Sequence, residues 1–168
     1  MAIRDIVTLP DPILKAVSEA VPAVTDETRT IFDDMLETMY KAPGIGLAAV
    51  QVGITQRLVT IDVSGEDEPD APLFVANPEI IWVSDTVREY EEGCLSIPDM
   101  YDNVVRPSEV KVAFLDYHGN RQELHCEGLL ATCIQHEIDH LDGVLFIDHL
   151  SRLKRERIVK KFVKAKKR

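Results

Sequence analysis

Apolar side chains recur at helical spacing over residues 26–40, which predicts the first amphipathic helix of the chain. Thr25 or Asp26 can cap the start of this helix, and Pro43-Gly44 follows its end. The predicted apolar stripe consists of Ile31, Phe32, Met35, Leu36, Met39 and Tyr40.

Two further helices are predicted nearer the end of the chain. Residues 129–141 carry apolar side chains on several sides, so this helix should be buried, and Gly143 can end it. Residues 152–165 are rich in lysine and arginine, but Ile158, Val159, Phe162 and Val163 share one face. The third helix is therefore basic, with one narrow apolar stripe.

The segments between the first two helices have patterns typical of β-strands. Residues 109–117 alternate between apolar and polar positions, and His118-Gly119-Asn120 can turn the chain into residues 121–126 to form a hairpin. The acidic residues 65–72 indicate a surface loop. The remaining predicted strands are residues 58–63, 73–76 and 80–83. Because strands and helices come in blocks rather than in alternation, the predicted fold class is α+β with antiparallel sheets.

Length and composition limit the class of protein. A chain of 168 residues with 45% hydrophobic residues is long enough to bury one sizeable core. It contains no apolar run near the roughly 20 residues that a membrane span requires. Its start has no secretory or transit pattern, so we expect a cytoplasmic protein. Three cysteines are too few for a disulfide framework and fit a reducing compartment, where one could act as a ligand or nucleophile.

Charge is distributed unevenly along the chain. Residues 151–168 contain ten basic residues and one acidic residue, a net charge of +9. Residues 1–150 contain the other nine basic and 28 acidic residues, a net charge of −19. An acidic body argues against sequence-specific nucleic-acid binding, whereas the basic end could bind a polyanion or could simply be a solvated helix face.

The strongest chemical signal is His136-Glu137-Ile138-Asp139-His140 on the second predicted helix. Residues four apart lie one turn apart on the same helix face, so both imidazoles can reach a single metal ion. Glu137 lies about 100° around the helix, beside the metal, where it can take a proton from an activated water molecule. Two histidines and a glutamate are costly in a buried helix unless they are paired or coordinated, which favours a metal site over an ordinary amphipathic helix.

A site with two histidines needs a third protein ligand and leaves one position open for water. Cys94 lies in Glu92-Gly93-Cys94-Leu95-Ser96-Ile97-Pro98, where Gly93 permits unusual backbone angles and Pro98 should halt the strand. Cys133, one turn before His136, is a rival, although its apolar neighbours are typical of a core cysteine. Cys126 should be structural, and His118, His125 and His149 have no spacing that relates them to the metal.

Residues 44–51 form the glycine-rich segment GIGLAAVQ. It is not a phosphate-binding loop of the Walker type, because no Gly-Lys-Ser/Thr follows, and the GxG lacks a third glycine. The glycines fit a close approach of the backbone to an extended ligand, to which the Gln51 amide could donate a hydrogen bond.

Taken in order, GIGLAAVQ, EGCLS and HEIDH resemble the three signature motifs of the peptide deformylase family, most closely the bacterial type, over residues 3–150. The resemblance implies that Cys94, His136 and His140 bind the metal and that Glu137 is the general base and then the general acid. It also implies that the Leu95 backbone N–H and the Gln51 side chain stabilise the oxyanion. The implied wall of the methionine pocket consists of Ile45, Gly46, Leu129 and Cys133.

The resemblance implies a hydrolase that removes the formyl group from the initiator methionine of nascent chains and releases formate. It implies Fe²⁺ as the metal, replaceable by Zn²⁺, Ni²⁺ or Co²⁺, although two imidazoles and a thiolate by themselves also suit zinc. The chain departs from the family at Thr132, where a larger apolar residue is common, and at Tyr101, where some relatives carry an arginine.

The expected architecture is a set of antiparallel sheets packed around a central helix that carries HExxH, with an N-terminal helix and a C-terminal basic helix. Residues 1–150 should form the catalytic domain, and residues 151–168 a basic helical extension of the same domain. The resemblance suggests that this extension docks on ribosomal RNA near the exit of the nascent chain, where its charge would meet phosphates.

Two alternatives remain at the level of sequence. A zinc peptidase with HExxH would add a downstream ligand, for which Asp142, Asp148 and His149 are the only nearby candidates, without a recognisable spacing. A catalytically idle relative that acts as a ribosome-associated binding module would be expected to lack Glu137 or to carry a bulky charged residue in place of Leu95. Both residues are present.

Overall fold

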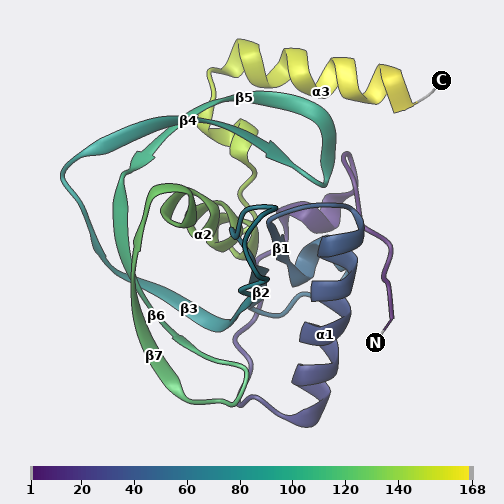
Figure 1. Ribbon diagram of the computed structural model, residues 1–168. Helices are drawn as coiled ribbons and strands as arrows, with labels where there is room; N and C mark the ends of the chain where they lie inside the picture. Colours follow the sequence, from purple (N-terminus) through teal and green to yellow (C-terminus); the bar gives the residue numbers. More distant parts are fainter. Residues whose placement is uncertain (1, 167–168) are drawn as a thin grey trace.

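The computed structural model describes residues 2–166 and is shown in Figure 1. Within these residues, the helices are α1 (Asp26–Lys41), α2 (Gly128–Leu141) and α3 (Arg152–Lys166), with short 3-10 helices η1 (Pro12–Lys15), η2 (Ala49–Val52) and η3 (Phe146–His149). The strands are β1 (Gly46–Ala48), β2 (Leu58–Ile61), β3 (Leu73–Val83), β4 (Val87–Cys94), β5 (Ile97–Pro107), β6 (Glu109–Leu115) and β7 (Arg121–Glu127).

The strands form two sheets with antiparallel pairing throughout. One sheet has five strands in the order β1-β2-β3-β6-β7, and the other is the hairpin of β4 and β5. The predicted α+β class with antiparallel sheets is confirmed. The predicted hairpin across residues 118–120 is also confirmed, since β6 pairs with β7 along its whole length and Gly119 takes a positive φ in the turn.

Helix α1 begins where the sequence predicted. The Thr25 side chain accepts a hydrogen bond from the backbone N–H of Thr28, and the Thr28 hydroxyl accepts one from the N–H of Thr25. Its buried face carries Phe32, Met35 and Met39 onto β1 and β2. The helix therefore closes one side of the five-stranded sheet (Figure 1).

Helix α2 packs against the same sheet, with contacts to β1, β2, β6 and β7. Ile134, Ile138 and Leu141 join a core cluster with buried valines of the strands, so the prediction that this helix is buried is confirmed. The chain leaves α2 through Gly143, whose φ is +76°. A Cβ at this glycine would collide with the backbone carbonyl of Lys15, so glycine is required here for space as well as for its dihedral angle.

The predicted strands 73–76 and 80–83 are two parts of the single strand β3. The pairing with β6 shifts between Ala76 and Glu79 and again between Ile80 and Trp82. Asn77 has a φ of +50°, and its side chain bonds to both the N–H and the carbonyl of Val21, at 2.8 Å each. The strand is therefore bulged rather than interrupted.

The hairpin of β4 and β5 is the largest element that the sequence patterns did not predict. The expectation that Pro98 halts a strand is wrong, because Pro98 lies at the second position of β5. Proline is tolerated there because this sheet has only two strands, so each has a free edge where a missing N–H costs no pairing. The two-residue turn at Leu95 and Ser96 joins the strands directly after Cys94.

Helix α3 lies along the outside of the hairpin, next to β5 (Figure 1). Phe162 is buried there in a cluster that also contains Val104 and Phe146, with Ile158 and Val159 packed at its side. Residues 167–168 of the predicted basic extension lie outside the described residues. Among residues 2–166, no helix combines the length and apolar character that crossing a membrane requires.

Candidate metal centre and active site

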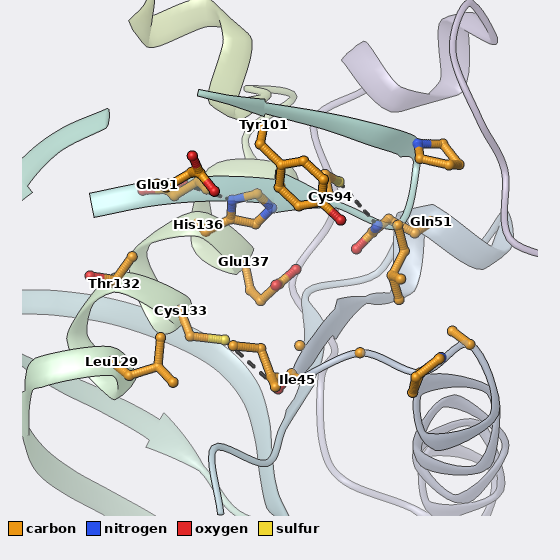
Figure 2. Close-up of a pocket in the computed structure, with 18 of the residues that line it drawn as sticks. Ile45, Gln51, Glu91, Cys94, Tyr101, Leu129, Thr132, Cys133, His136 and Glu137 are labelled. Carbon is orange, nitrogen blue, oxygen red and sulfur yellow. Dashed lines mark hydrogen bonds and ion pairs between the residues drawn. The ribbon is translucent and has the colours of Figure 1, made fainter. Parts of the chain in front are cut away.

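Residues from all three sequence motifs line a single open pocket of about 770 Å³. Its walls come from residues 42–46, the end of β4, the start of β5 and one face of α2 (Figure 2). The volume lies in the range of small-ligand sites. Three segments far apart in sequence thus meet at one concavity.

The histidines of α2 point toward Cys94 at the end of β4. His140 Nε2 lies 3.2 Å from the Cys94 Sγ atom, and the rings of His136 and His140 have centroids 5.0 Å apart. One potential ligand atom from each of the three residues lies within 4.8 Å of the others. Three ligand atoms this close together can bind a single metal ion, and a fourth coordination position would remain for water or substrate from the pocket.

Buried charges hold His136 in position. Its Nδ1 donates to Glu92 Oε1 at 2.9 Å, which leaves Nε2 free to face a metal. Arg106 donates to both Glu92 oxygens, at 2.7 and 2.9 Å. Burial alone would raise the pKa of Glu92, but the hydrogen bonds from His136 and Arg106 outweigh it and lower this pKa to about 2.

The same network continues to the surface. Arg106 Nη1 donates to Asp139 Oδ2 at 2.8 Å, and His149 Nε2 lies 2.8 Å from the same oxygen. His149 does not touch the candidate ligands, as the sequence predicted, but it forms the outer end of a chain that reaches His136. Each buried member of this chain has a charged or hydrogen-bonded partner, which buried polar groups require.

The surroundings of the two histidines suit a cation. Burial and the nearby positive charges of His136 and Arg106 lower the pKa of His140 well below its usual value, so this imidazole is neutral and available as a ligand. Burial also disfavours a charged His136, but Glu137, Cys94 and Glu92 raise its pKa well above the usual value. Acidic neighbours that favour a proton at this position equally favour a metal ion, so the residues fit the metal that the HExxH pattern predicts.

Glu137 projects from α2 into the pocket beside these atoms (Figure 2). It is 4% exposed, and its Oε1 atom has no hydrogen-bond partner among the described residues. Burial raises the pKa of Glu137 to about 7. A Cβ at Gly46 would collide with this carboxylate and with Cys133, so glycine is needed to bring the β1 backbone this close. An unpaired carboxyl group near pKa 7 is suited to proton transfer.

Gln51 is held with its amide nitrogen toward the same point. Its Oε1 accepts from the N–H of Ala48 at 2.9 Å, which fixes the orientation of the amide. Its Nε2 donates to Ser96 Oγ at 3.1 Å and lies 3.6 Å from Cys94 Sγ. Leu95 directly follows Cys94, in the β4–β5 turn, and also lines the pocket.

Cys133 and Cys126 lie in environments that differ from that of Cys94. The Cys133 thiol donates to the carbonyl oxygen of Ile45 at 3.8 Å, and burial together with Glu137 raises its pKa well above the usual value. Burial raises the pKa of Cys126 to about 11. Both thiols are therefore held in the unreactive protonated form, and the structure brings Cys94 rather than either of them to the histidines.

The lower wall of the pocket is mainly apolar. Ile45, Leu129 and Cys133 lie together on this side, and Thr132 of α2 also lines the pocket (Figure 2). Tyr101 stands on the opposite side and is 62% exposed. Its ring lies directly on Gly93, where a Cβ would collide with it.

The downstream residues that a peptidase would use are engaged elsewhere. Asp142 pairs with Arg57 at 2.9 Å, and Asp148 pairs with Lys15. His149 pairs with Asp139. Among the described residues, none of the three joins the group of candidate ligand atoms around Cys94.

A second group of possible ligand atoms lies on the outer ends of β6 and β7. It consists of Glu109, His125 and Glu127, and it is largely exposed. His125 Nε2 lies 2.8 Å from Glu109 Oε1, an ordinary surface ion pair when the imidazole is protonated. None of these three residues is among the described residues that line the pocket.

Sequence reasoning missed Glu92, Arg106 and Asp139 as parts of the site. Glu92 lies in the segment that contains Cys94 and Asp139 lies between the two histidines, but neither residue has a sequence signal for a role. A signal was available for Arg106, since it is the single charged residue in Val104-Val105-Arg106-Pro107. A lone arginine among apolar strand residues is a candidate for a buried ion pair.

Comparison with known proteins agrees with the motifs. The family profile described as polypeptide deformylase matches residues 3–156. The peptide deformylase of Phenylobacterium zucineum is 57% identical over 164 residues, covering 98% of this chain and 97% of that protein. The peptide deformylase of Methylocella silvestris is 55% identical, covering 99% of this chain and 87% of that protein.

Solved structures share the whole fold. Peptide deformylase from Ehrlichia chaffeensis in complex with actinonin is 43% identical, with a TM-score of 0.94 over 100% of this chain and 99% of that one. The Legionella pneumophila enzyme is 45% identical, with a TM-score of 0.92 over 99% and 96% of the two chains. The chain therefore belongs to the polypeptide deformylase family, metal-dependent hydrolases that remove the formyl group from formyl-methionyl peptides.

Proposed function

We propose that Cys94, His136 and His140 hold the catalytic metal and that Glu137 moves the protons of the deformylation reaction. The observation that carries this proposal is the convergence of the three candidate ligand atoms beside the buried Glu137 carboxyl group, whose Oε1 has no hydrogen-bond partner among the described residues. When bound, the metal ion acidifies a water molecule and polarises the formyl oxygen. Glu92 and Arg106 act through His136, whose ring they hold in one orientation and one tautomer.

Glu137 transfers protons in both halves of the reaction. Its carboxylate takes a proton from water as the water oxygen bonds to the formyl carbon, and the carboxylic acid then gives that proton to the amine nitrogen. The carbon–nitrogen bond breaks as the nitrogen is protonated, which yields formate and a free methionyl amine. A pKa of about 7 allows Glu137 to serve as base and as acid near neutral pH.

Gln51 and the N–H of Leu95 stabilise the negative charge that develops on the formyl oxygen. The Gln51 amide cannot rotate freely, because the Ala48 N–H and Ser96 hydroxyl hold its two ends. A preorganised donor of this kind is typically worth about 10²–10³ in rate.

The apolar wall formed by Ile45, Gly46, Leu129 and Cys133 receives the methionine side chain. The thioether is unbranched and polarisable, so it suits a wall of mixed aliphatic and sulfur character. The formyl group carries only hydrogen beyond its carbon, and the backbone of Gly46 against Glu137 leaves little space for an acetyl methyl group.

Fe²⁺ is our proposal for the physiological metal, with Zn²⁺, Ni²⁺ or Co²⁺ able to replace it. The donor set of two imidazoles and one thiolate accepts any of these ions, and raw affinity alone would favour Zn²⁺ over Fe²⁺. Metal content and activity of protein purified without oxygen would distinguish them.

The remaining proposals concern the whole chain. Residues 1–150 form the catalytic domain, in which the sheets are arranged around α2 as a central helix, and residues 151–168 form a basic extension of the same domain. We place the enzyme in the cytoplasm, where it meets formylated nascent chains. The exposed basic residues of α3 support docking to ribosomal RNA by phosphate contacts.

The central test is formate release from a formyl-methionyl tripeptide by protein loaded anaerobically with Fe²⁺. We expect formate from the formyl peptide and no product from the acetyl peptide. Glu137→Gln should bind the metal but release formate at least about 10²-fold more slowly. Full metal content with unchanged turnover in this variant would remove Glu137 from the mechanism.

Ribosome docking is tested separately by a chain that ends at Leu150. This truncation should lose cosedimentation with ribosomes at low salt while it still deformylates a free peptide. Its folding is checked by circular dichroism, because α3 covers part of the core. Full cosedimentation of a folded truncation would exclude the extension as the docking element.

A further inference from the structure

The Asp62 carboxylate accepts four hydrogen bonds from neutral groups. Asp62 directly follows β2 and is 5% exposed. Its Oδ1 accepts from the backbone N–H and the hydroxyl of Ser64, at 2.9 and 2.5 Å. Its Oδ2 accepts from the Tyr40 hydroxyl at 2.5 Å and from the N–H of Ala71 at 3.0 Å. Burial raises the pKa of Asp62, but these hydrogen bonds outweigh it and the net effect lowers this pKa, so the carboxylate is ionised and held in one position.

The backbone of Asp62 supports the apolar wall of the pocket. Its N–H donates to the carbonyl oxygen of Ile45 at 2.9 Å, and the preceding residue, Ile61, pairs with Gly46 between β2 and β1. Ile45 and Gly46 both line the pocket, and Figure 2 shows the Ile45 side chain in its lower wall. Ile45 is 43% exposed, so packing around its side chain holds it only in part. The position of Ile45 therefore depends on its backbone contact with Asp62.

Tyr40 connects Asp62 to the segment that leads into this wall. It lies in the last turn of α1, five residues before Ile45. Within the short segment between them, the N–H of Gly44 donates to the carbonyl oxygen of Met39 at 2.8 Å. Burial and the Asp62 carboxylate raise the pKa of Tyr40 above its usual value, so its hydroxyl keeps its proton and remains a donor. The hydrogen bond from Tyr40 to Asp62 thus closes a loop that runs from the end of α1 through this segment to the end of β2.

We infer that the Tyr40–Asp62 pair positions Ile45 and Gly46, and that it thereby determines how well the pocket distinguishes methionine from a shorter side chain. Neither Tyr40 nor Asp62 is among the described residues that line the pocket, so both are positioning residues that act through the wall. The inference rests on the proposed function of this wall as the methionine site. A small outward shift of the wall removes dispersion contacts from a side chain that reaches it, whereas a side chain that ends before the wall loses none.

The main test is Tyr40→Phe, which removes one oxygen atom and leaves the ring in place. Formate release is measured with the Fe²⁺ enzyme for a formyl-methionyl and a formyl-alanyl peptide that are otherwise identical. We expect KM for the methionyl peptide to rise about fivefold with kcat nearly unchanged, which lies within the range that one hydrogen bond contributes. For the alanyl peptide, kcat/KM should change by less than about twofold, so the methionine-to-alanine ratio of kcat/KM should fall.

Tyr117→Phe is the matched control. The Tyr117 hydroxyl donates to Asp33 Oδ2 of α1 at 3.2 Å, and Tyr117 is not among the described residues that line the pocket. Each variant therefore loses a tyrosine–aspartate hydrogen bond that involves α1, but only the Tyr40 bond is connected to the wall. Tyr117→Phe should keep the wild-type KM and the wild-type methionine-to-alanine ratio. Circular dichroism and metal content establish that both variants are folded and loaded with metal.

Asp62→Asn tests the pair rather than the tyrosine alone. This change removes the charge and should lower the methionine-to-alanine ratio at least as much as Tyr40→Phe does. Because the two residues act through one hydrogen bond, the double variant should have a ratio within about twofold of that of Asp62→Asn. Fully additive effects would show that the residues act independently and would overturn the inference. If Asp62→Asn fails to fold, the comparison of Tyr40→Phe with Tyr117→Phe decides the question.

Ile45→Ala separates failure of the inference from failure of the proposed function. This change alters the wall itself and should lower the methionine-to-alanine ratio. If it does so and Tyr40→Phe does not, the inference is overturned and the proposed function stands. An equal loss of kcat for both peptides in Tyr40→Phe, with KM unchanged, also overturns the inference, because the hydroxyl would then serve only the stability of the fold. If the wild type releases no formate, or if Ile45→Ala keeps the ratio, the proposed function of the wall fails and the inference fails with it.

Discussion

Helices α2 and α3 have nearly the same length and are consecutive helices in the C-terminal part of the chain, yet their environments are opposite. In α2, ten of fourteen residues are buried, and the polar ones among them include both histidines and the glutamate of HExxH. In α3, the charged residues from Arg152 to Lys164 face solvent, and Phe162 is the only buried residue among positions 152–165. The ionisable groups of HExxH in α2 are therefore largely desolvated, whereas the charges of α3 can act only on what approaches from outside.

The difference lies in how the polar groups are balanced. Glu92 and Arg106 form a buried ion pair that positions His136, and removing one partner of such a pair leaves an uncompensated charge. The ion pair of α3 between Arg152 and Glu156 is exposed and contributes little. The following changes should show this contrast, in order of decreasing effect.

Replacement of Arg106 should have the largest effect on stability. Arg106→Met leaves Glu92 buried without its bidentate partner, and we expect the free energy of unfolding to fall by about 3–5 kcal/mol. Its cross-strand neighbour Arg88 provides the control, since it is exposed and packs over the ring of Tyr90. Arg88→Met should cost about 1 kcal/mol or less. Urea unfolding of both variants measures this, and equal losses would contradict the proposed role of burial.

Lowering the pH should destabilise the buried network of Glu92, Arg106 and His136 over a defined pH range. The pKa of Glu92 is about 2 in the folded chain and 4.5 in the unfolded reference, so the unfolded state binds the proton first as pH falls. The stabilisation from this group is fully present above pH 4.5 and is lost as pH falls toward 2. A difference of this size corresponds to about 3 kcal/mol.

Comparison with Glu92→Gln isolates this contribution. Urea unfolding should be measured between pH 6 and pH 2.5 with metal removed from both proteins, because protons also displace metals from imidazole and thiolate. The wild type should lose more stability than the variant across this window. Parallel curves would show that Glu92 is not the group responsible.

The packing of α3 against the hairpin should depend on its apolar stripe of Ile158, Val159 and Phe162. Phe162→Ala removes the side chain that α3 buries in the cluster with Val104 and Phe146, and it should weaken the docking of the helix by about 2 kcal/mol. Hydrogen exchange at the α3 amides should become roughly 30-fold faster, with little change in α2. Leu153→Ala is the control, because Leu153 is apolar but 68% exposed. Similar exchange rates in the two variants would contradict the prediction that the burial of Phe162 holds α3 in place.

Removal of charge from the outer face of α3 should have the smallest effect on the molecule itself. The double variant Lys160→Ala with Lys161→Ala should change the free energy of unfolding by no more than about 0.5 kcal/mol, since both side chains are exposed. Turnover of a free formyl peptide should also be unaffected. Cosedimentation with ribosomes at low salt should decrease, and a decrease in peptide turnover would instead connect α3 to the active site.

The three helices could be predicted from the sequence because the signals that start, continue and end a helix come from nearby residues. The cap at Thr25, the apolar stripe of α1 and the glycine after α2 each depend on neighbours within a few residues. The β4–β5 hairpin escaped prediction because Val87–Cys94 is largely polar and exposed, without the alternation of a half-buried strand. A hairpin that presents a candidate ligand next to its turn and lines a pocket need not bury one full face.

The sequence by itself determined which chemistry was available. Two histidines one helical turn apart must share a face, a glutamate between them must lie to the side, and the order of the three motifs indicated a deformylase. Tertiary structure decided which groups are charged, paired or free. Glu92, Arg106 and Asp139 are ordinary charged residues in the sequence, and they become one network only because β4, β5 and α2 bring them together. The physical reason is that spacing along a helix is set by local geometry, whereas burial and charge pairing depend on contacts between distant segments.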